Sequence, residues 1–485
     1  MGDTSSPPIP ATSSLGRNSF AGWRDYPANL ATYDPLITDG YGLSGRLLEK
    51  ASQLFKGDSE AMAVELFEIA GHESAEVRTS RFSSAHCLER HFLTVPLPRT
   101  RIIAVSQQHS LAPLGILEES MRKVLTYHQV TPDFLTNLFA CGEHPQASDA
   151  GSGNFTFHPL ASGGHETIYT LRYVEENGRS HGNPWSIRQT TIYHQRSAQD
   201  ESSWILLHPR EDSTFQMRLK NAISRGEALE RIQADPLKLH LLLLSSYASN
   251  WHKYLGYLST SFMDAADMAL TMDLEDVAEY RLSFETLQSL RHLSDKVPPL
   301  VAILQASITT IERIGHSYTS GCRSRGPHRF QLEDVSRLSS YSHQLQGYLK
   351  SAEILQTRIQ GILNLLADAL NMRSQATAAD LNKYMLGLTK KSVDDSATVR
   401  VVGIVSLIYL PATFTATILG MDFFTFEIST SSIGIAKDFW VYLVISIPLT
   451  VLTVGWWVVL LARKKARKAA LEPQGTEKST GALGV

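Results

Sequence analysis

The sequence has few cysteines and little excess charge of either sign. Its 485 residues include three cysteines, Cys87, Cys141 and Cys322, which are far apart and odd in number. This count argues against a disulfide framework and fits a reducing compartment. The formal net charge is only −3, and no zinc-finger spacing or basic patch interleaved with aromatic residues is present. Nucleic acid is therefore not an expected partner.

Motifs that carry catalysis are also missing. The chain has no Walker loop, no dinucleotide-binding glycine fingerprint, no nucleophile elbow and no His-Glu-x-x-His zinc motif. Its seventeen histidines are scattered along the sequence. We predict that His181, His194 and His208, near the expected strands, are surface or hydrogen-bonded groups rather than metal ligands. We expect neither an enzyme nor a bound cofactor.

Two long apolar runs near the C-terminus are the most informative feature that is present. No charge falls between Val401 and Leu419, a run of roughly 19 residues or about 28 Å of helix. A second uncharged run follows at 439–462. A helix that is apolar on every side is either deeply buried or spans a membrane. We predict transmembrane helices at 399–420 and 439–462 with a short outer loop at 421–438; the alternative is a buried helical hairpin.

The charges around these runs predict the orientation. Five basic residues follow the second run: Arg463, Lys464, Lys465, Arg467 and Lys468. The segment between the runs is mainly acidic and holds a single lysine. The positive-inside rule therefore places the basic tail, 463–485, in the cytosol, and two spans bring the N-terminal part to the same side. We expect an integral membrane protein in a lipid bilayer with both termini cytosolic, in the plasma membrane rather than an internal one.

The remaining residues are enough for one large or two modest domains. Residues 1–40, rich in Ser, Pro and Gly and without a signal-peptide-like apolar stretch, are predicted to be a flexible leader. A mixed α/β cytosolic domain is expected over 41–235, and a long-helix stalk over 236–398. Helical patterning occurs at 44–55 and 114–127; β-branched and aromatic residues predict strands at 167–174, 185–194 and 203–207; breaks in the later helices are expected at Pro298–Pro299 and 321–327.

The last long helix carries a heptad pattern. Apolar residues recur in steps of three and four at Leu345, Tyr348, Ala352, Leu355, Ile359, Ile362, Leu366 and Ala369. No proline interrupts the chain between this seam and Val401, so we expect one continuous helix into the membrane. On the sequence alone, the seam can pack either against neighbouring helices of the same chain or against other subunits, as in a coiled coil.

The first span has one face that carries hydroxyl groups. On a helix, one stripe is formed by Val399, Val402, Ser406, Leu410, Thr413, Thr417 and Gly420. Hydroxyls on a single face suit a water-filled path, and apolar rings in its cytosolic half can gate by excluding water. The alternative is that the Ser and Thr side chains bond to carbonyls of their own helix or mediate helix packing.

The residues that close this span resemble a known family. Pro411, Thr413 and Phe414 form a Pro-x-Thr-Phe segment that runs into Gly420-Met421-Asp422. This arrangement, followed by a short loop and a final span, resembles the CorA family of divalent-cation channels, in which Gly-Met-Asn lies at the outer mouth. Asp422 replaces that Asn, as in diverged CorA-like proteins of fungi. The resemblance implies an α+β cytosolic domain with long helices leading into a two-span C-terminal hairpin.

The resemblance also implies a function. A homo-oligomer, expected to be a pentamer, would conduct Mg²⁺ or a related divalent cation passively through a pore lined by the first span, with Gly420, Met421 and Asp422 at the entrance. Asp422 would contact the ion through its hydration shell, since Mg²⁺ sheds water reluctantly. Carboxylates in place of amides could preserve conduction, broaden selectivity or hold the ion too tightly. The competing hypothesis is a membrane-anchored scaffold or sensor without transport, with Asp422 an ordinary interfacial residue.

Overall fold

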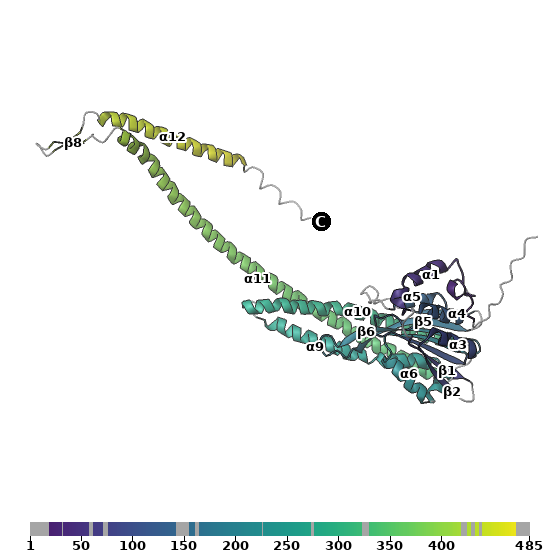
Figure 1. The fold of residues 1–485 in the computed structure, drawn as a ribbon. Helices are drawn as coiled ribbons and strands as arrows, with labels where there is room; N and C mark the ends of the chain where they lie inside the picture. Colours follow the sequence, from purple (N-terminus) through teal and green to yellow (C-terminus); the bar gives the residue numbers. More distant parts are fainter. Residues whose placement is uncertain are drawn as a thin grey trace, which may run out of the picture. The chain divides into compact units, whose positions relative to one another are not determined.

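The computed structural model describes residues 19–31, 33–57, 62–70, 76–141, 155–160, 164–225, 227–272, 276–322, 329–418, 424–427, 432–435 and 439–471 (Figure 1). The chain divides into two compact units, Met1–Leu370 and Asn371–Val485. The first unit holds a sheet with helices on both faces. The second holds the C-terminal part of the longest helix, a short hairpin and the final helix.

A mixed seven-stranded sheet forms the centre of the first unit. Its spatial order is β2-β1-β3-β7-β6-β5-β4, and β3 pairs with β7 in parallel whereas the other neighbours are antiparallel. The strands are β1 (Val64–Ala70), β2 (Glu76–Phe82), β3 (Thr100–Ser106), β4 (Thr156–Pro159), β5 (His165–Glu176), β6 (Trp185–Arg196) and β7 (Ser202–His208). The three strands expected from the sequence are therefore present as β5, β6 and β7.

Helices cover both faces of this sheet (Figure 1). Before β7, the last strand of this sheet in sequence order, the chain forms the 3-10 helix η1 (Trp23–Asp25) and helices α1 (Gly40–Glu49), α2 (Ala51–Leu54), α3 (Ala85–Thr94), α4 (Glu118–Tyr127) and α5 (Asp133–Phe139). After it come α6 (Thr214–Ser224), α7 (Glu227–Ala234), α8 (Leu237–Tyr247), α9 (Asn250–Thr271), α10 (Val277–Cys322) and α11 (Arg329–Ile418).

Alternation along the strands produces two separate cores. On β3, Ile103 and Val105 join the core formed with α1 to α5, whereas Ile102 and Ala104 join the core formed with α6 to α11. Successive strand residues point to opposite faces, so a run that is apolar at every position is buried on both sides. The unit is thus a three-layer α/β domain, in agreement with the expected mixed α/β fold with long helices.

Helix α10 does not break at Pro298–Pro299, and the expectation of a break there was wrong. The helix is continuous for 46 residues and contains both prolines. A proline in a helix removes a backbone hydrogen bond, which costs about 3 kcal/mol or more. The adjacent Val297 and Leu300 are completely buried in the helical core. Burial of these neighbours offsets the cost and holds the two prolines in helical conformation.

Helix α11 is continuous from Arg329 to Ile418, 90 residues, as the absence of proline before Val401 indicated. Its heptad seam packs against helices of the same chain. Leu355 and Ile359 belong to the core shared with α9 and α10. Gln360 Nε2 donates to Ser294 Oγ of α10 at 2.6 Å, and the Arg358 guanidinium lies 5.1 Å from the centre of the Phe262 ring of α9. Of the two packings left open by the sequence, the structure shows the intrachain one.

The second unit contains two helices long and apolar enough to cross a membrane. These candidate spans are Thr398–Thr417 of α11 and Phe439–Arg463 of α12, which runs from Phe439 to Leu471. Between them, β8 (Phe424–Glu427) pairs antiparallel with β9 (Ser432–Ile435). The segment expected as a short outer loop thus carries a small hairpin.

Candidate ion pathway

The hydroxyl-bearing stripe of the first span lies on the exposed side of α11 within this chain. Val399, Val402, Ser406, Leu410, Thr413 and Thr417 are all exposed. Most other side chains of the span are exposed as well, including Val401 and Tyr409. Exposure alone therefore does not distinguish the stripe from the rest of the span. The stripe is distinguished by its position relative to the buried face of the helix.

That buried face lies opposite the stripe. Pro411 and Thr415 are the buried residues of the span, and beside them the Tyr442 hydroxyl of α12 donates to the Ala412 carbonyl at 3.4 Å. Thr413 and Thr415 are two residues apart, or about 200° around a helix of 3.6 residues per turn. Helix α12 thus covers one side of α11 and leaves the face with Thr413 and Thr417 free.

The threonine hydroxyls donate to carbonyls of their own helix. Thr413 Oγ1 donates to the Tyr409 carbonyl at 3.0 Å, and Thr417 Oγ1 donates to the Thr413 carbonyl at 2.7 Å. This is the local bonding considered as the alternative to a pore lining. The two roles are compatible, because a hydroxyl that has donated its proton keeps acceptor lone pairs, which suit the water shell of a cation. Local bonding also fixes where these oxygens lie.

The expected entrance residues Gly420, Met421 and Asp422 lie outside the described residues. The stripe reaches toward them, since Thr417 is one residue before the end of α11 at Ile418. No group of three or more His, Cys, Asp or Glu side chains that could hold a metal ion occurs in the part of the chain that the structure describes.

The histidines beside the strands differ in their surroundings. His181 is exposed, whereas His194 and His208 are buried. His194 Nε2 is 2.9 Å from Ser202 Oγ, and its ring stacks on Trp204 with centroids 3.7 Å apart. Burial, reinforced by the nearby His240, lowers the pKa of His194 well below its ordinary value. Burial also lowers the pKa of His208, to about 3, so the two buried histidines are neutral core groups.

The comparisons with known proteins define the class. The family model of CorA-like transporters matches residues 18–270, just over half of the chain. The chain therefore belongs to the CorA-like transporters. The residues matched by the family model precede the Pro-x-Thr-Phe and Gly-Met-Asp motifs. The family match and the motif resemblance therefore arise from different parts of the sequence. Family and apolar helices together support an integral membrane protein.

One curated relative is the notoamide biosynthesis cluster protein M' of Aspergillus versicolor, 34% identical over 104 residues, or 21% of this chain and 22% of that protein. The chain thus covers about a fifth of that relative's length. Among solved structures, the CorA magnesium transporter of Methanocaldococcus jannaschii is 10% identical over 81% of this chain and 96% of its own, with a TM-score of 0.37. The ZntB cytoplasmic domain of Vibrio parahaemolyticus is 11% identical over 65% of this chain and 99% of its own, with a TM-score of 0.35. The full-length CmaX protein is 12% identical over 84% of this chain and 99% of its own, with a TM-score of 0.40.

Proposed function

We propose that copies of this chain assemble into a passive channel for Mg²⁺ or a related divalent cation. The stripe that includes Ser406, Thr413 and Thr417 would line the pore. The observation that carries the proposal is the division of α11 into two faces: α12 covers the face with Pro411 and Thr415, and the opposite face bears the hydroxyls. Membership of the CorA-like transporters supports the same role.

The proposed path combines wet and dry sections. Hydroxyl oxygens of Thr413 and Thr417 would contact the hydration shell of the ion, which suits a cation that dehydrates reluctantly. Val399, Val402 and Leu410 would form apolar rings below them, where exclusion of water closes the path. Conduction needs several copies, since one helix encloses no pore. We propose a homopentamer in the plasma membrane, with both termini cytosolic and Asp422 at the outer entrance.

The channel hypothesis and the hypothesis of a membrane-anchored scaffold or sensor differ in the effect that they expect from Asp422. In the anchored scaffold or sensor hypothesis, the replacement of Asn by Asp abolishes conduction while the fold is kept. A carboxylate attracts cations more strongly than an amide does. In the channel hypothesis, the same change deepens the attraction at the entrance without closing the path.

Flux into liposomes tests the two hypotheses. Purified full-length protein would be reconstituted around a Mg²⁺-sensitive dye, with Asp422→Asn, Asp422→Ala and, as a matched carboxylate of the outer segment, Asp438→Asn. We expect influx down the gradient in the wild type and in the Asn variant, a several-fold loss in the Ala variant, and little change at Asp438. A silent wild type beside an active Asp422→Asn variant would support the anchored scaffold. Silence of all four, with correct insertion, would contradict the channel.

A further inference from the structure

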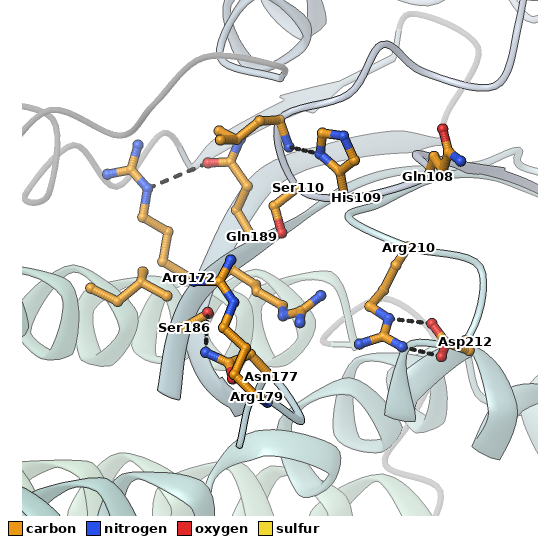
Figure 2. A pocket seen from close by; sticks show the side chains of 13 residues that line it. Gln108, His109, Ser110, Arg172, Asn177, Arg179, Ser186, Gln189, Arg210 and Asp212 are labelled. Atoms are coloured by element: carbon orange, nitrogen blue, oxygen red, sulfur yellow. Dashed lines mark hydrogen bonds and ion pairs between the residues drawn. The ribbon is translucent and has the colours of Figure 1, made fainter. Parts of the chain in front are cut away.

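The first unit contains a basic cavity that has no part in the proposed ion path. Its volume is about 720 Å³, which lies within the range of small-molecule sites. Four arginines line it, Arg172, Arg179, Arg188 and Arg210, together with a single carboxylate, that of Asp212 (Figure 2). Glu175 does not line the cavity but pairs with Arg188, so four guanidinium groups are set against two carboxylates and leave a surplus of two positive charges, in a chain whose net charge is −3.

The topology of the sheet creates this cavity. Strands β3 and β7 are parallel neighbours, so the loops that follow them, at 107–112 and 209–213, meet at the carboxyl end of these two strands. The β5–β6 hairpin extends beyond that end of the strands, because β6 pairs with β7 only over Thr191–Arg196. No strand of the described chain pairs with β6 on that side over 185–190, and the cavity lies beside this unpaired part.

The turn of the hairpin is built to hold its shape. Gly178 and Gly182 adopt φ of 71° and 83°, a left-handed conformation that glycine accepts readily. The Asn177 amide donates to the Asn183 carbonyl at 2.9 Å and to Ser186 Oγ at 3.1 Å, and its carbonyl oxygen accepts from the Arg179 backbone at 2.9 Å. The backbone that carries Arg179 is thereby fixed beside the cavity (Figure 2).

Arg188 is the buried cation of the group. Its residue is 8% exposed, and its Nε lies 3.1 Å from Glu175 Oε2. The other carboxylate oxygen of Glu175 accepts from Thr214 Oγ1 at 2.9 Å, at the start of α6. Glu175 is therefore shared between the guanidinium and a helix N-terminus. A buried guanidinium with one shared carboxylate retains capacity for a second anion, since it has five N–H donors.

The other arginines are placed around it by polar contacts of different kinds. Arg210 forms a forked pair with Asp212, which lowers the pKa of that carboxyl, and Arg172 Nε lies 3.5 Å from Gln189 Oε1 (Figure 2). The exposed Arg179 side chain has no ion-pair partner among the described residues. The four arginines thus line the cavity from β5, β6, the hairpin turn and the loop after β7, with Arg172 and Arg188 on opposite faces of the β5–β6 hairpin.

We propose that this cavity binds a small polyphosphorylated anion. Guanidinium groups match phosphate oxygens in a bidentate geometry, and several of them spread around one cavity suit a ligand with several phosphate groups. Leu111 and Ile187 give part of the wall an apolar surface, against which an organic group such as a nucleoside can pack. The shared chemistry is a polyphosphate; it can come from a nucleotide or from inorganic polyphosphate.

Calorimetry on the purified full-length protein tests this binding independently of ion transport. The probes are ATP, inorganic tripolyphosphate and citrate, each without Mg²⁺ and at low and moderate salt. We expect ATP or tripolyphosphate to bind at least tenfold more tightly than citrate, with affinity falling as salt rises. Tighter binding of ATP than of tripolyphosphate indicates that the nucleoside is recognised, and equal binding indicates that the polyphosphate alone is recognised.

Two exposed or half-exposed arginines supply the variants, because replacement of buried Arg188 threatens folding. Arg179→Ala and Arg172→Ala should each weaken binding at least tenfold, whereas Arg291→Ala, an exposed arginine of α10 outside the cavity, should leave it unchanged. Thermal unfolding of each variant checks that the domain is intact. Absence of binding by both phosphate probes, equal binding of citrate, or equal affinities in all three variants would overturn the proposal, whatever the liposome flux shows.

Discussion

Two consecutive stretches of α11 carry similar apolar patterns in opposite surroundings. Over 345–370, residues such as Leu355 and Ile359 are buried against α9 and α10. Over 371–392, every residue but Arg373 is exposed, although Leu381, Tyr384 and Leu388 again follow one another in steps of three and four. An apolar heptad indicates that a helix packs against another helix. It does not indicate whether that helix belongs to the same chain or to another subunit.

The comparison assigns different roles to the two stretches. The first is occupied by the chain's own helices, and thus its side chains stabilise the fold of one subunit. The second presents Leu381 at 62% and Tyr384 at 66% exposed, with no cover from its own chain among the described residues. Since the proposed channel needs several copies, we expect this stretch to form the contacts between them. Each of the following predictions tests or refines that division.

The largest effect is expected from a charge placed in the buried stretch. Ile359→Lys puts an ammonium where the side chain is 1% exposed, and we expect it to lower the free energy of unfolding by about 3 kcal/mol or more. Chemical unfolding of the solubilised protein measures this. Ile354→Lys, five residues earlier on the exposed side of the same helix, is the matched control and should change it little. Equal stability of the two variants would contradict the intrachain role of the seam.

A pair of charges in the exposed stretch should act on assembly instead. Leu381→Lys with Leu388→Lys should leave the unfolding of the first unit unchanged and raise the dissociation constant of the oligomer at least about 30-fold, equivalent to about 2 kcal/mol. Native mass spectrometry across a dilution series measures it. Ala379→Lys with Leu386→Lys places the same charges about 200° away around the helix. An unchanged oligomer in the first variant would place the subunit contacts elsewhere.

Acid should destabilise the first unit through its buried histidines, and the sequence after residue 343 contains no histidine. Burial lowers the pKa of His128, His208 and His240 to about 3. Below about pH 6.5 the unfolded chain binds protons that the folded chain does not, so stability falls as pH falls toward 3. Each histidine contributes about 1.4 kcal/mol per pH unit in that window.

His208→Phe isolates one of these contributions. Neither ring nitrogen of His208 has a hydrogen-bond partner among the described groups, so Phe loses no bond. In urea unfolding followed by tryptophan fluorescence, this variant should lose less stability than the wild type between pH 7.5 and 5.5, by about 1.4 kcal/mol in total and mostly below pH 6.5. Replacing exposed His181 with Gln should not alter the dependence. An unchanged slope in His208→Phe would mean that His208 takes up a proton in the folded state.

The smallest effect concerns the two faces of the membrane-spanning part of α11. If Leu410 is an apolar constriction, Leu410→Ser eases wetting and should raise cation flux several-fold in liposomes. Ile408 lies about 200° away, on the side of Pro411 and Thr415, so Ile408→Ser should disturb packing against α12 with little change in flux per inserted molecule. Equal effects at both positions would remove the distinction between the faces and favour the anchored scaffold.

The sequence predicted three of the strands, in which the local pattern agrees with the tertiary environment. β5, β6 and β7 are rich in β-branched and aromatic residues and were expected. β1 was missed because Glu68 interrupts its apolar pattern. In the structure Glu68 is cross-strand partner of Arg101, whose Nη2 lies 2.8 Å away, and the other carboxylate oxygen of Glu68 lies 2.8 Å from His91 Nε2. A buried charge satisfied by distant residues cannot be distinguished from an exposed one in the sequence.

Long-range packing explains the other differences. Pro298–Pro299 follows every local rule for a helix end, yet burial of Val297 and Leu300 keeps α10 continuous. The cavity arginines are spread over 172–210 with no contiguous basic motif, and only the pairing of β5 with β6 and of β3 with β7 brings them together. The face of α11 that bears the hydroxyls was predictable from helical periodicity alone, since it depends on residues three and four apart.

The exposed stretch 371–392 also bears on the turnover of the protein. An isolated helix of about 20 residues without a packed face is marginal in water and opens readily to extended forms that a protease can bind. This stretch contains Arg373, Lys383, Lys390 and Lys391, which are cleavage sites for a trypsin-like enzyme. We expect the monomer to be cut there and the assembled oligomer to resist cleavage. The lifetime of the chain would then depend on whether it has assembled.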